Sequence, residues 1–181
     1  SIPGARPGVM VVHEWYGHGA YSRRRAEMLA ALGYLAFAAD MYGKGVYAKD
    51  HQQAGKLAGA VRGDRKLMRE RALSGVETLK KHKLVDPSKL AAIGYCFGGT
   101  AVLELARAGT DLKGVASFHG SLETPMPAEP GTVKARVLVL HGADDAHVNP
   151  QVTAFQDEMR KAKADWQFVS YGGAVHSFTV R

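Results

Sequence analysis

The chain has 181 residues, which is long enough for one domain with a substantial buried core. A hydrophobic content of 46% and a charged content of 23% are ordinary for a soluble globular protein. The formal net charge is +7, but the 24 basic residues are spread along the chain among 17 acidic ones, with no RNA-binding signature or zinc-ligand spacing. We therefore expect no nucleic-acid partner, and no membrane association, because no apolar run approaches the ~18 residues of a membrane span.

Cysteine usage indicates the compartment. The single cysteine, Cys96, cannot form an internal disulfide, which favours either a reducing compartment or a functional thiol. The first ten residues, SIPGARPGVM, contain neither the charged nor the apolar segment of a secretory leader. The sequence therefore predicts a cytoplasmic protein, although the chain does not begin with Met and a removed leader stays an open alternative.

Six segments are predicted as strands. They are short apolar runs without strict alternation, a pattern typical of strands buried on both faces of a parallel sheet. The predicted strands are residues 8–13, 33–40, 90–96, 115–120 and 135–142, with a more amphipathic sixth at 166–173.

Helical patterns lie between these strands. The predicted helices are residues 20–32, 64–83, 98–108 and 150–163. Strand–helix alternation predicts an α/β fold with a mostly parallel central sheet, in one domain over residues 1–181. Residues 41–63 are the least regular, and are either an excursion on the substrate side or a solvated connection. No helical pattern follows the sixth strand, so we expect the C-terminal helix that would cover it to be missing from this chain.

The residues around Cys96 carry the strongest chemical signal. The segment Gly94-Tyr95-Cys96-Phe97-Gly98 is a G-x-C-x-G pattern between a predicted strand and a predicted helix, the thiol counterpart of a nucleophile elbow. Such a turn forces its central residue to a strained, positive φ and leaves no space for side chains at the flanking glycines. The sulfur would lie at the positive end of the helix, with the Phe97 N–H facing a developing oxyanion. The structural alternative is a small buried cysteine under a glycine turn.

An elbow nucleophile needs an acid and a histidine, in the chain order nucleophile, acid, base. The segment HGADDAHVNP follows the fifth predicted strand, where Asp145 fits a G-x-x-D-x-x-V spacing and Asp144 is the alternative. The segment GGAVHSF places His176 on a glycine-entered loop after the sixth strand. We predict that Asp145 orients His176 and that His176 transfers the proton. A turn acid and a structural histidine are the non-catalytic alternatives.

The segment HEWYGH after the first strand is expected to complete the site. It supplies the second oxyanion donor of this fold, which we predict to be the N–H of Trp15. Glu14 is a carboxylate at the end of a buried strand, where an unpaired charge is costly, so we expect it to have a partner in the site or among the arginines at 23–25. The spacing of His13, Glu14 and His18 is not that of a helical HExxH zinc motif, and no metal is predicted.

Together these motifs resemble the dienelactone hydrolase family, a branch of the α/β-hydrolases. The matching segments are HEWYG after the first strand, LAALGYLAFAADMYGKG at 29–45, GYCFGG at the elbow, HGADDAHV at the acid and VHSF at the base. The resemblance implies a three-layer α/β-hydrolase fold and a Cys–His–Asp triad formed by Cys96, His176 and Asp145. It also implies that Glu14 holds the resting thiol until substrate displaces it.

The resemblance further implies a pocket and a substrate. Tyr16 and Ser177 would line the pocket, and the type member of the family hydrolyses a dienelactone. An arginine that contacts the substrate carboxylate in that member is replaced here by Val180, and a second one has no aligned position within residues 41–63.

We therefore predict a hydrolase without cofactor that cleaves a small-molecule ester or lactone, as a monomer or homodimer. A thiolate nucleophile suits activated esters, whose leaving groups are good. Two alternatives stay open: a thioesterase on the same residues, or a non-catalytic module that uses the Cys96 thiol for redox sensing or binding.

Overall fold

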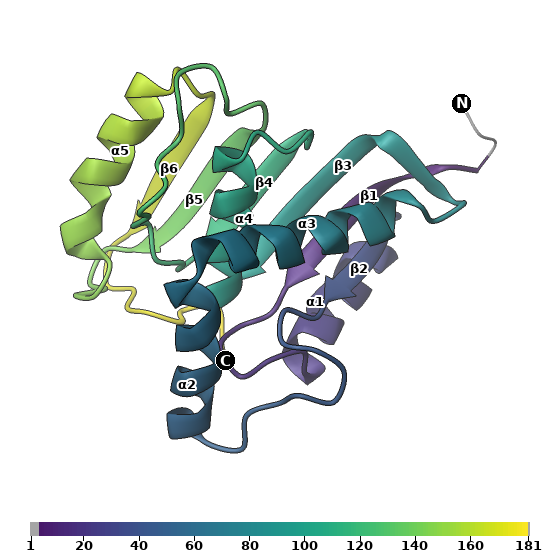
Figure 1. The fold of residues 1–181 in the computed structure, drawn as a ribbon, viewed down its shortest axis with the longest axis horizontal. Coiled ribbons are helices and arrows are strands. Elements are labelled where there is room, and N and C mark those ends of the chain that lie inside the picture. The colour runs from purple at the N-terminus through teal and green to yellow at the C-terminus, as the bar shows by residue number, and fades with distance from the viewer. Residues whose placement is uncertain (1–3, 181) are drawn as a thin grey trace.

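The computed structural model describes residues 4–180, whose centre is a parallel sheet of six strands. The strands are β1 (Arg6–Val12), β2 (Leu35–Ala39), β3 (Val85–Tyr95), β4 (Gly114–Phe118), β5 (Arg136–Gly142) and β6 (Trp166–Tyr171). They lie in the order β2-β1-β3-β4-β5-β6, and every neighbouring pair is parallel (Figure 1). The predicted α/β fold is therefore confirmed, and the carboxyl ends of all six strands lie at one edge of the sheet.

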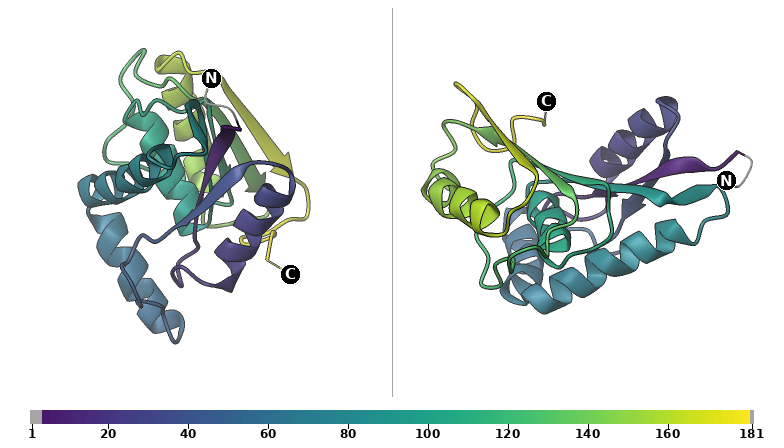
Figure 2. Two further views of the ribbon diagram at one scale, coloured as in Figure 1. Left: turned by 90° about the vertical axis from the view of Figure 1, so that its right-hand side faces the viewer. Right: turned by 90° about the horizontal axis from the view of Figure 1, so that it is seen from above.

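Helices form the outer layers. They are α1 (Ala20–Ala31), α2 (His51–Gly63), α3 (Arg65–Lys80), α4 (Phe97–Arg107) and α5 (Val152–Lys161), the last preceded by a short 3-10 turn at Asn149–Gln151. One face of the sheet carries α1, and the opposite face carries α3, α4 and α5, as the edge-on view shows (Figure 2). This arrangement is the predicted three-layer architecture.

The helix α4 holds the elbow in place because it is buried along its whole length. It packs between α3 and the strands β3 and β4. Its one acidic side chain, Glu104, is fully buried and accepts hydrogen bonds from Arg69 Nε (2.8 Å) and Arg107 Nη1 (3.0 Å). Because buried charges are tolerated only when paired, this network ties α4 to α3 on the side away from the sheet.

Two boundaries differ from the sequence-based prediction. Residues 51–63, predicted as part of an irregular segment, form the regular helix α2, whose first turn is capped by Asp50 accepting from the Gln53 N–H (2.7 Å). The buried positions of α2 are Ala54, Ala58 and Val61, so its apolar face is too small to stand out as a helical pattern. Strand β3 begins five residues before the predicted start, because Val85 and Asp86 pair with Arg6 and Pro7 of β1. Residues 87–89 then form an irregularity in the strand, and pairing resumes at Leu90.

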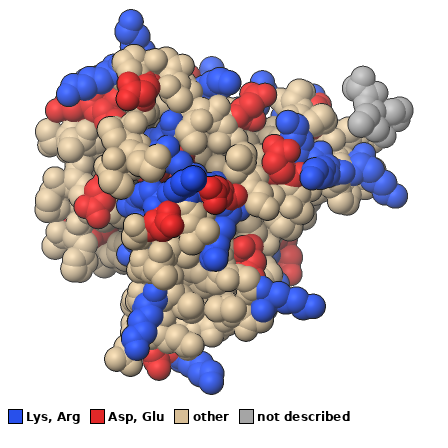
Figure 3. Space-filling model, viewed as in Figure 1, with Lys and Arg blue, Asp and Glu red and all other residues tan. Residues whose placement is uncertain are grey.

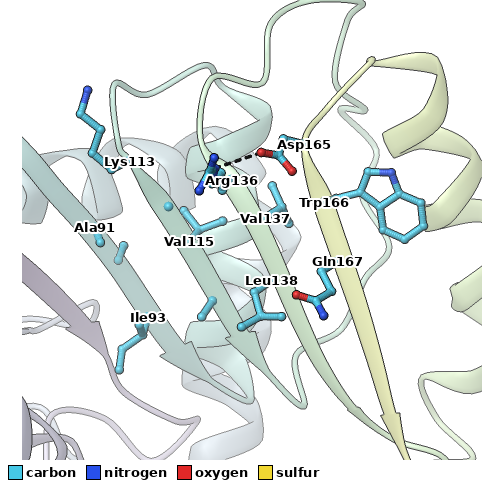
Figure 4. A pocket seen from close by; sticks show the side chains of 13 residues that line it. Ala91, Ile93, Lys113, Val115, Arg136, Val137, Leu138, Asp165, Trp166 and Gln167 are labelled. Atoms are coloured by element: carbon cyan, nitrogen blue, oxygen red, sulfur yellow. Dashed lines mark ion pairs between the residues drawn. The ribbon is translucent and has the colours of Figure 1, made fainter.

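Among residues 4–180, a helix covers the face of the sheet opposite α3, α4 and α5 only at β1 and β2. Over β3–β6 that face is open, and a shallow hollow of about 620 Å³ lies there (Figure 4). Small and apolar side chains such as Ala91, Ile93 and Leu138 form its floor, and the ion pair of Arg136 with Asp165 (3.0 Å) lies at its rim. The hollow follows the first residues of β4, β5 and β6 and the part of β3 that pairs with the start of β4. It therefore lies away from the carboxyl edge, where ligands bind in open α/β sheets.

The surface carries charges of both signs. Lys and Arg side chains are interspersed with Asp and Glu over the face in Figure 3 rather than gathered in one stripe. Within residues 4–180, none of the helices combines the length and apolar character needed to cross a bilayer.

Candidate active site

Cys96 lies at the sharp turn between β3 and α4. Its backbone has φ 52° and ψ −113°, the positive-φ conformation predicted for the centre of an elbow. Residues other than glycine occupy this region rarely, and the strain is tolerated where the surrounding structure imposes it. The turn presents the sulfur at the N-terminal end of α4. The N–H of Phe97 lies in the first turn of that helix, and N–H groups there have no intrahelical acceptor.

The flanking glycines permit the close approach of three backbone segments. A Cβ atom on Gly94 would collide with the carbonyl group of Gly98, and one on Gly98 would collide with the carbonyl oxygen of Val12. A Cβ on Gly99 would lie 2.9 Å from the Cα of Gly120. Because the neighbours at Gly94 and Gly98 are backbone atoms, no change of side-chain rotamer relieves these contacts.

We expect Gly94→Ala to destabilise the folded protein by about 3 kcal/mol or more, because the added methyl group overlaps the backbone of α4. The matched control is Gly59→Ala in α2, where nothing lies within 4 Å of the new Cβ and the better helix former should stabilise by about 0.5–1 kcal/mol. Urea unfolding measures both changes. A Gly94→Ala protein as stable as the wild type would contradict this account of the elbow.

The structure brings Cys96, His176 and Asp145 into a line of contacts. The Cys96 Sγ lies 3.2 Å from His176 Nε2, and His176 Nδ1 lies 2.7 Å from Asp145 Oδ2. Asp145 is buried, and its other oxygen accepts from the backbone N–H groups of His147 (3.1 Å) and Val148 (3.3 Å). These bonds leave Nδ1 of His176 as the donor to Asp145 and turn Nε2 towards the sulfur.

The alternative acid, Asp144, has a different place. Its side chain is exposed, and its backbone N–H donates to the Ala174 carbonyl (2.9 Å), which connects the acid loop to the loop that carries His176. Of the two aspartates, only Asp145 contacts the His176 ring.

The electrostatics of the three groups favour a charged pair. The hydrogen bond with Cys96 raises the pKa of His176 to about 9; burial opposes this rise, and the negative charges of Cys96 and Asp145 add to it. Burial alone would raise the pKa of Asp145, but the hydrogen bond and charge of His176 and two backbone N–H groups lower it overall. The arrangement therefore favours a positively charged imidazolium at His176, placed between the Cys96 sulfur and the Asp145 carboxylate.

Glu14 is half-buried at the end of β1. Burial raises the pKa of its carboxyl, and the positive charges of His176 and Arg25 partly offset that rise. Neither of the expected close partners is observed: within residues 4–180 no hydrogen bond joins Glu14 to Cys96, and no ion pair joins it to the arginines at 23–25. The sulfur contacts His176 instead, and Arg25 donates to Thr179 and Tyr21. A role for Glu14 in holding the thiol stays a prediction.

A pocket of about 470 Å³ opens at Cys96 and His176. Its lining residues are Trp15, Arg62, Cys96, Ser121, Glu123, His147, Val148, Gln151, His176 and Ser177. The predicted oxyanion donor Trp15 and the predicted lining residue Ser177 are therefore at the pocket, the latter with a positive φ of 61°. Tyr16 is not among the lining residues, because its ring packs against Trp15, Tyr47 and His51. Contact between Tyr16 and a substrate stays a prediction.

Arg62 is one of the lining residues that the sequence analysis did not single out. It comes from the last turn of α2, its Nε is buried without a hydrogen-bond partner, and its guanidinium lies 6.0 Å from the centre of the Phe97 ring. Its position depends on the helix that was not predicted. Within the described residues, no group of three or more His, Cys, Asp or Glu side chains has the arrangement of a metal site.

Comparison with known proteins identifies relatives over nearly the whole chain. A protein of Aquifex aeolicus named "Putative carboxymethylenebutenolidase" is 30% identical over 181 residues, which cover 96% of this chain and 77% of that protein. An uncharacterised protein of Caenorhabditis elegans is 40% identical over 116 residues, 62% of this chain and 73% of its own. The crystal structure of a dienelactone hydrolase-like promiscuous phosphotriesterase from metagenomic libraries matches with a TM-score of 0.90 and 42% identity, covering 97% of this chain and 74% of that one.

The model of the dienelactone hydrolase family matches residues 2–181, which is almost the full length given. The solved structure with a TM-score of 0.90 agrees with the α/β fold and its parallel central sheet. This chain is therefore a member of the dienelactone hydrolase family.

Proposed function

We propose that this protein hydrolyses small esters or lactones through a covalent thioester on Cys96. Membership of a hydrolase family supports the reaction class, and the name of the Aquifex aeolicus relative describes the cleavage of a lactone. The observation that carries the proposal is the continuous contact from Cys96 through His176 to Asp145, at the wall of a pocket of about 470 Å³. These three residues are the proposed catalytic groups.

In the first half-reaction the Cys96 sulfur, with its charge balanced by the His176 imidazolium, attacks the carbonyl carbon of the ester. The carbonyl oxygen becomes an oxyanion that accepts from the N–H groups of Phe97 and Trp15. Collapse of this intermediate breaks the bond to the leaving oxygen, which takes the proton from His176 Nε2. The products are the alcohol and a thioester on Cys96; with a lactone the alcohol stays attached to the acyl group.

The second half-reaction needs His176 as a base, and acylation supplies that change. A sulfur bound in a thioester carries no charge, so the main cause of the raised pKa of His176 is removed. The neutral imidazole then takes a proton from water, which attacks the thioester carbonyl. The carboxylic acid leaves, the proton remains on His176, and Cys96 recovers its negative charge. Asp145 keeps Nδ1 of His176 protonated throughout, so that each proton is taken up and released at Nε2.

Arg62 supports a narrower substrate class. Arg62 lines the same pocket as Cys96, and its buried Nε has no hydrogen-bond acceptor, which costs free energy. A carboxylate on the ligand would accept a charge-assisted hydrogen bond from this Nε. We therefore propose that the preferred ester or lactone carries a carboxylate, with Arg62 as its partner. Glu123 lines the same pocket and would oppose an anion placed beside it, so the carboxylate lies on the Arg62 side.

The experiment is a panel of aryl esters and lactones with and without a carboxylate, assayed with wild type and with Arg62→Met. We expect hydrolysis of both classes by the wild type, and a loss of about 10–100-fold in kcat/KM for the carboxylate substrates alone in Arg62→Met. Lys56→Met, which removes an exposed charge from the same helix, is the matched control. An aryl phosphotriester belongs in the panel because the 42%-identical relative is called a phosphotriesterase. A wild type that cleaves none of the esters or lactones would refute the proposed function.

A further inference from the structure

A second buried histidine, His119, lies between the two segments that carry the proposed nucleophile and base. It follows the last residue of β4 and is 1% exposed, with a positive φ of 41°. Its Nδ1 lies 3.2 Å from the backbone N of Cys96, and its Nε2 lies 2.7 Å from Thr179 Oγ1. Since the Cys96 N–H donates, Nδ1 accepts, and Nε2 carries the proton and donates to the Thr179 hydroxyl.

Thr179 is held from its other side by α1. Tyr21 Oη lies 2.8 Å from the Thr179 hydroxyl, and Arg25 Nη2 donates both to the Thr179 carbonyl (2.9 Å) and to Tyr21 Oη (3.1 Å). The guanidinium of Arg25 also lies over the rings of Tyr21 and Tyr95. The chain three residues after His176 is therefore fixed between the end of β4 and α1.

The ring of His119 also contacts the ring of His176 directly. The two centroids are 5.4 Å apart in an edge-to-face arrangement, and Phe178 packs on His119 in the same way at 5.3 Å. Burial lowers the pKa of His119 to about 4, and the charge of His176 lowers it further, against the smaller effect of Asp145. His119 is thus neutral where His176 is charged. The other charged groups that act on His119 or His176 are Arg25 and Glu14.

We propose that His119 is a positioning residue which, through its hydrogen bond to Thr179, holds the loop carrying His176 at contact distance from Cys96. Its hydrogen bonds go to the Cys96 backbone N–H and to Thr179, not to the Cys96 sulfur or the His176 nitrogens, and it does not line the pocket; it acts by joining the elbow to the loop that carries His176. The inference rests on the proposed function, in which the Cys96–His176 contact sets the charge of the sulfur. Loss of the connection leaves the pocket in place but weakens that contact.

The first test removes the acceptor at Thr179. We expect Thr179→Val, which keeps the shape but not the hydroxyl, to lower kcat for an aryl ester about five- to tenfold with little change in KM. The pH profile of Cys96 alkylation by iodoacetamide should move to higher pH, because a displaced imidazolium stabilises the thiolate less. Thr179→Ser keeps the hydroxyl and should restore both readouts. Thr153→Val, the same change at an exposed position of α5, is the matched control.

The second test changes the reach of the side chain at position 119. The amide of His119→Gln extends about as far as Nε2 and can still meet Thr179, whereas the amide of His119→Asn reaches only the position of Nδ1. We expect His119→Gln to keep most of the wild-type kcat and alkylation profile, and His119→Asn to behave like Thr179→Val. Asn tolerates a positive φ better than Gln, so backbone strain predicts the opposite order.

Both outcomes that would overturn the inference are measurable. Thr179→Val and His119→Asn with wild-type kcat and alkylation profile would show that the bond does not position His176. Equal losses in Thr179→Ser and Thr179→Val would assign the effect to packing instead. Failure of the proposed function looks different: the wild type would show no Cys96-dependent turnover, while the alkylation profiles would still report on the position of His176.

Discussion

Cys96→Ala is expected to lower kcat for aryl esters by roughly 10⁶-fold, the order of magnitude lost when the nucleophile of a hydrolytic triad is removed. Nothing else in the pocket replaces the sulfur: Ser121 and Ser177 line it, but His176 lies against Cys96. Stopped-flow assays with an activated aryl ester should show a burst of the phenol in the wild type and none in the variant. Mass spectrometry should find the acyl group on the peptide that contains Cys96.

The same variant tests the electrostatic account of the site. Removing the sulfur removes the hydrogen bond and charge that most raise the pKa of His176, so this pKa should fall from about 9 by about one to three pH units. The direction follows from the sign of the missing charge: without the thiolate, the imidazolium releases its proton at lower pH. NMR titration of the ring C–H signals measures the shift. A variant that keeps either the wild-type turnover or the wild-type His176 titration would contradict the proposed role of Cys96.

Local patterns predicted the part of the site that depends on strand ends. The elbow glycines and the positive φ of Cys96 follow from the steric demands of one turn, and the loops of Asp145 and His176 follow strands whose carboxyl ends lie at one edge. Because all six strands are parallel, the three loops that carry Cys96, Asp145 and His176 meet at the same edge of the sheet. The sequence-based model of the fold was correct because the strand signals were continuous apolar runs, which are typical of a buried parallel sheet.

Features that depend on packing between distant segments were not predictable in this way. The buried face of α2 consists of two alanines and a valine, so the helix was missed and with it the direction of Arg62. His119 carries no local signal either, because its partners, Cys96 and Thr179, lie 23 and 60 residues away. The surroundings of Glu14 were not predictable for a similar reason: of the arginines at 23–25, Arg25 donates to Tyr21 and Thr179, which only the tertiary structure brings together.

The two adjacent aspartates offer the sharpest test of the acid. In Asp145→Asn one side-chain oxygen should still accept from the backbone N–H groups of His147 and Val148, which turns the new NH₂ group towards His176 Nδ1. Nδ1 must then accept, so the proton moves to Nε2, and the ring can no longer take a proton at the atom that faces the sulfur. We expect kcat to fall by about 10³- to 10⁴-fold, as in other triads where an amide imposes the wrong tautomer.

Asp144→Asn makes the same change one residue earlier and should leave kcat near the wild-type value. The Asp144 side chain is exposed, and the contact that Asp144 makes with the His176 loop uses its backbone N–H, which Asn retains. Steady-state kinetics with one activated ester compares the two variants directly, and thermal unfolding checks that both are folded. Equal losses in the two variants would mean that the charge of this loop matters rather than the contact with His176. A loss in Asp144→Asn alone would move the acid to that residue and would require the loop to rearrange, because its buried neighbour now occupies the place beside the imidazole.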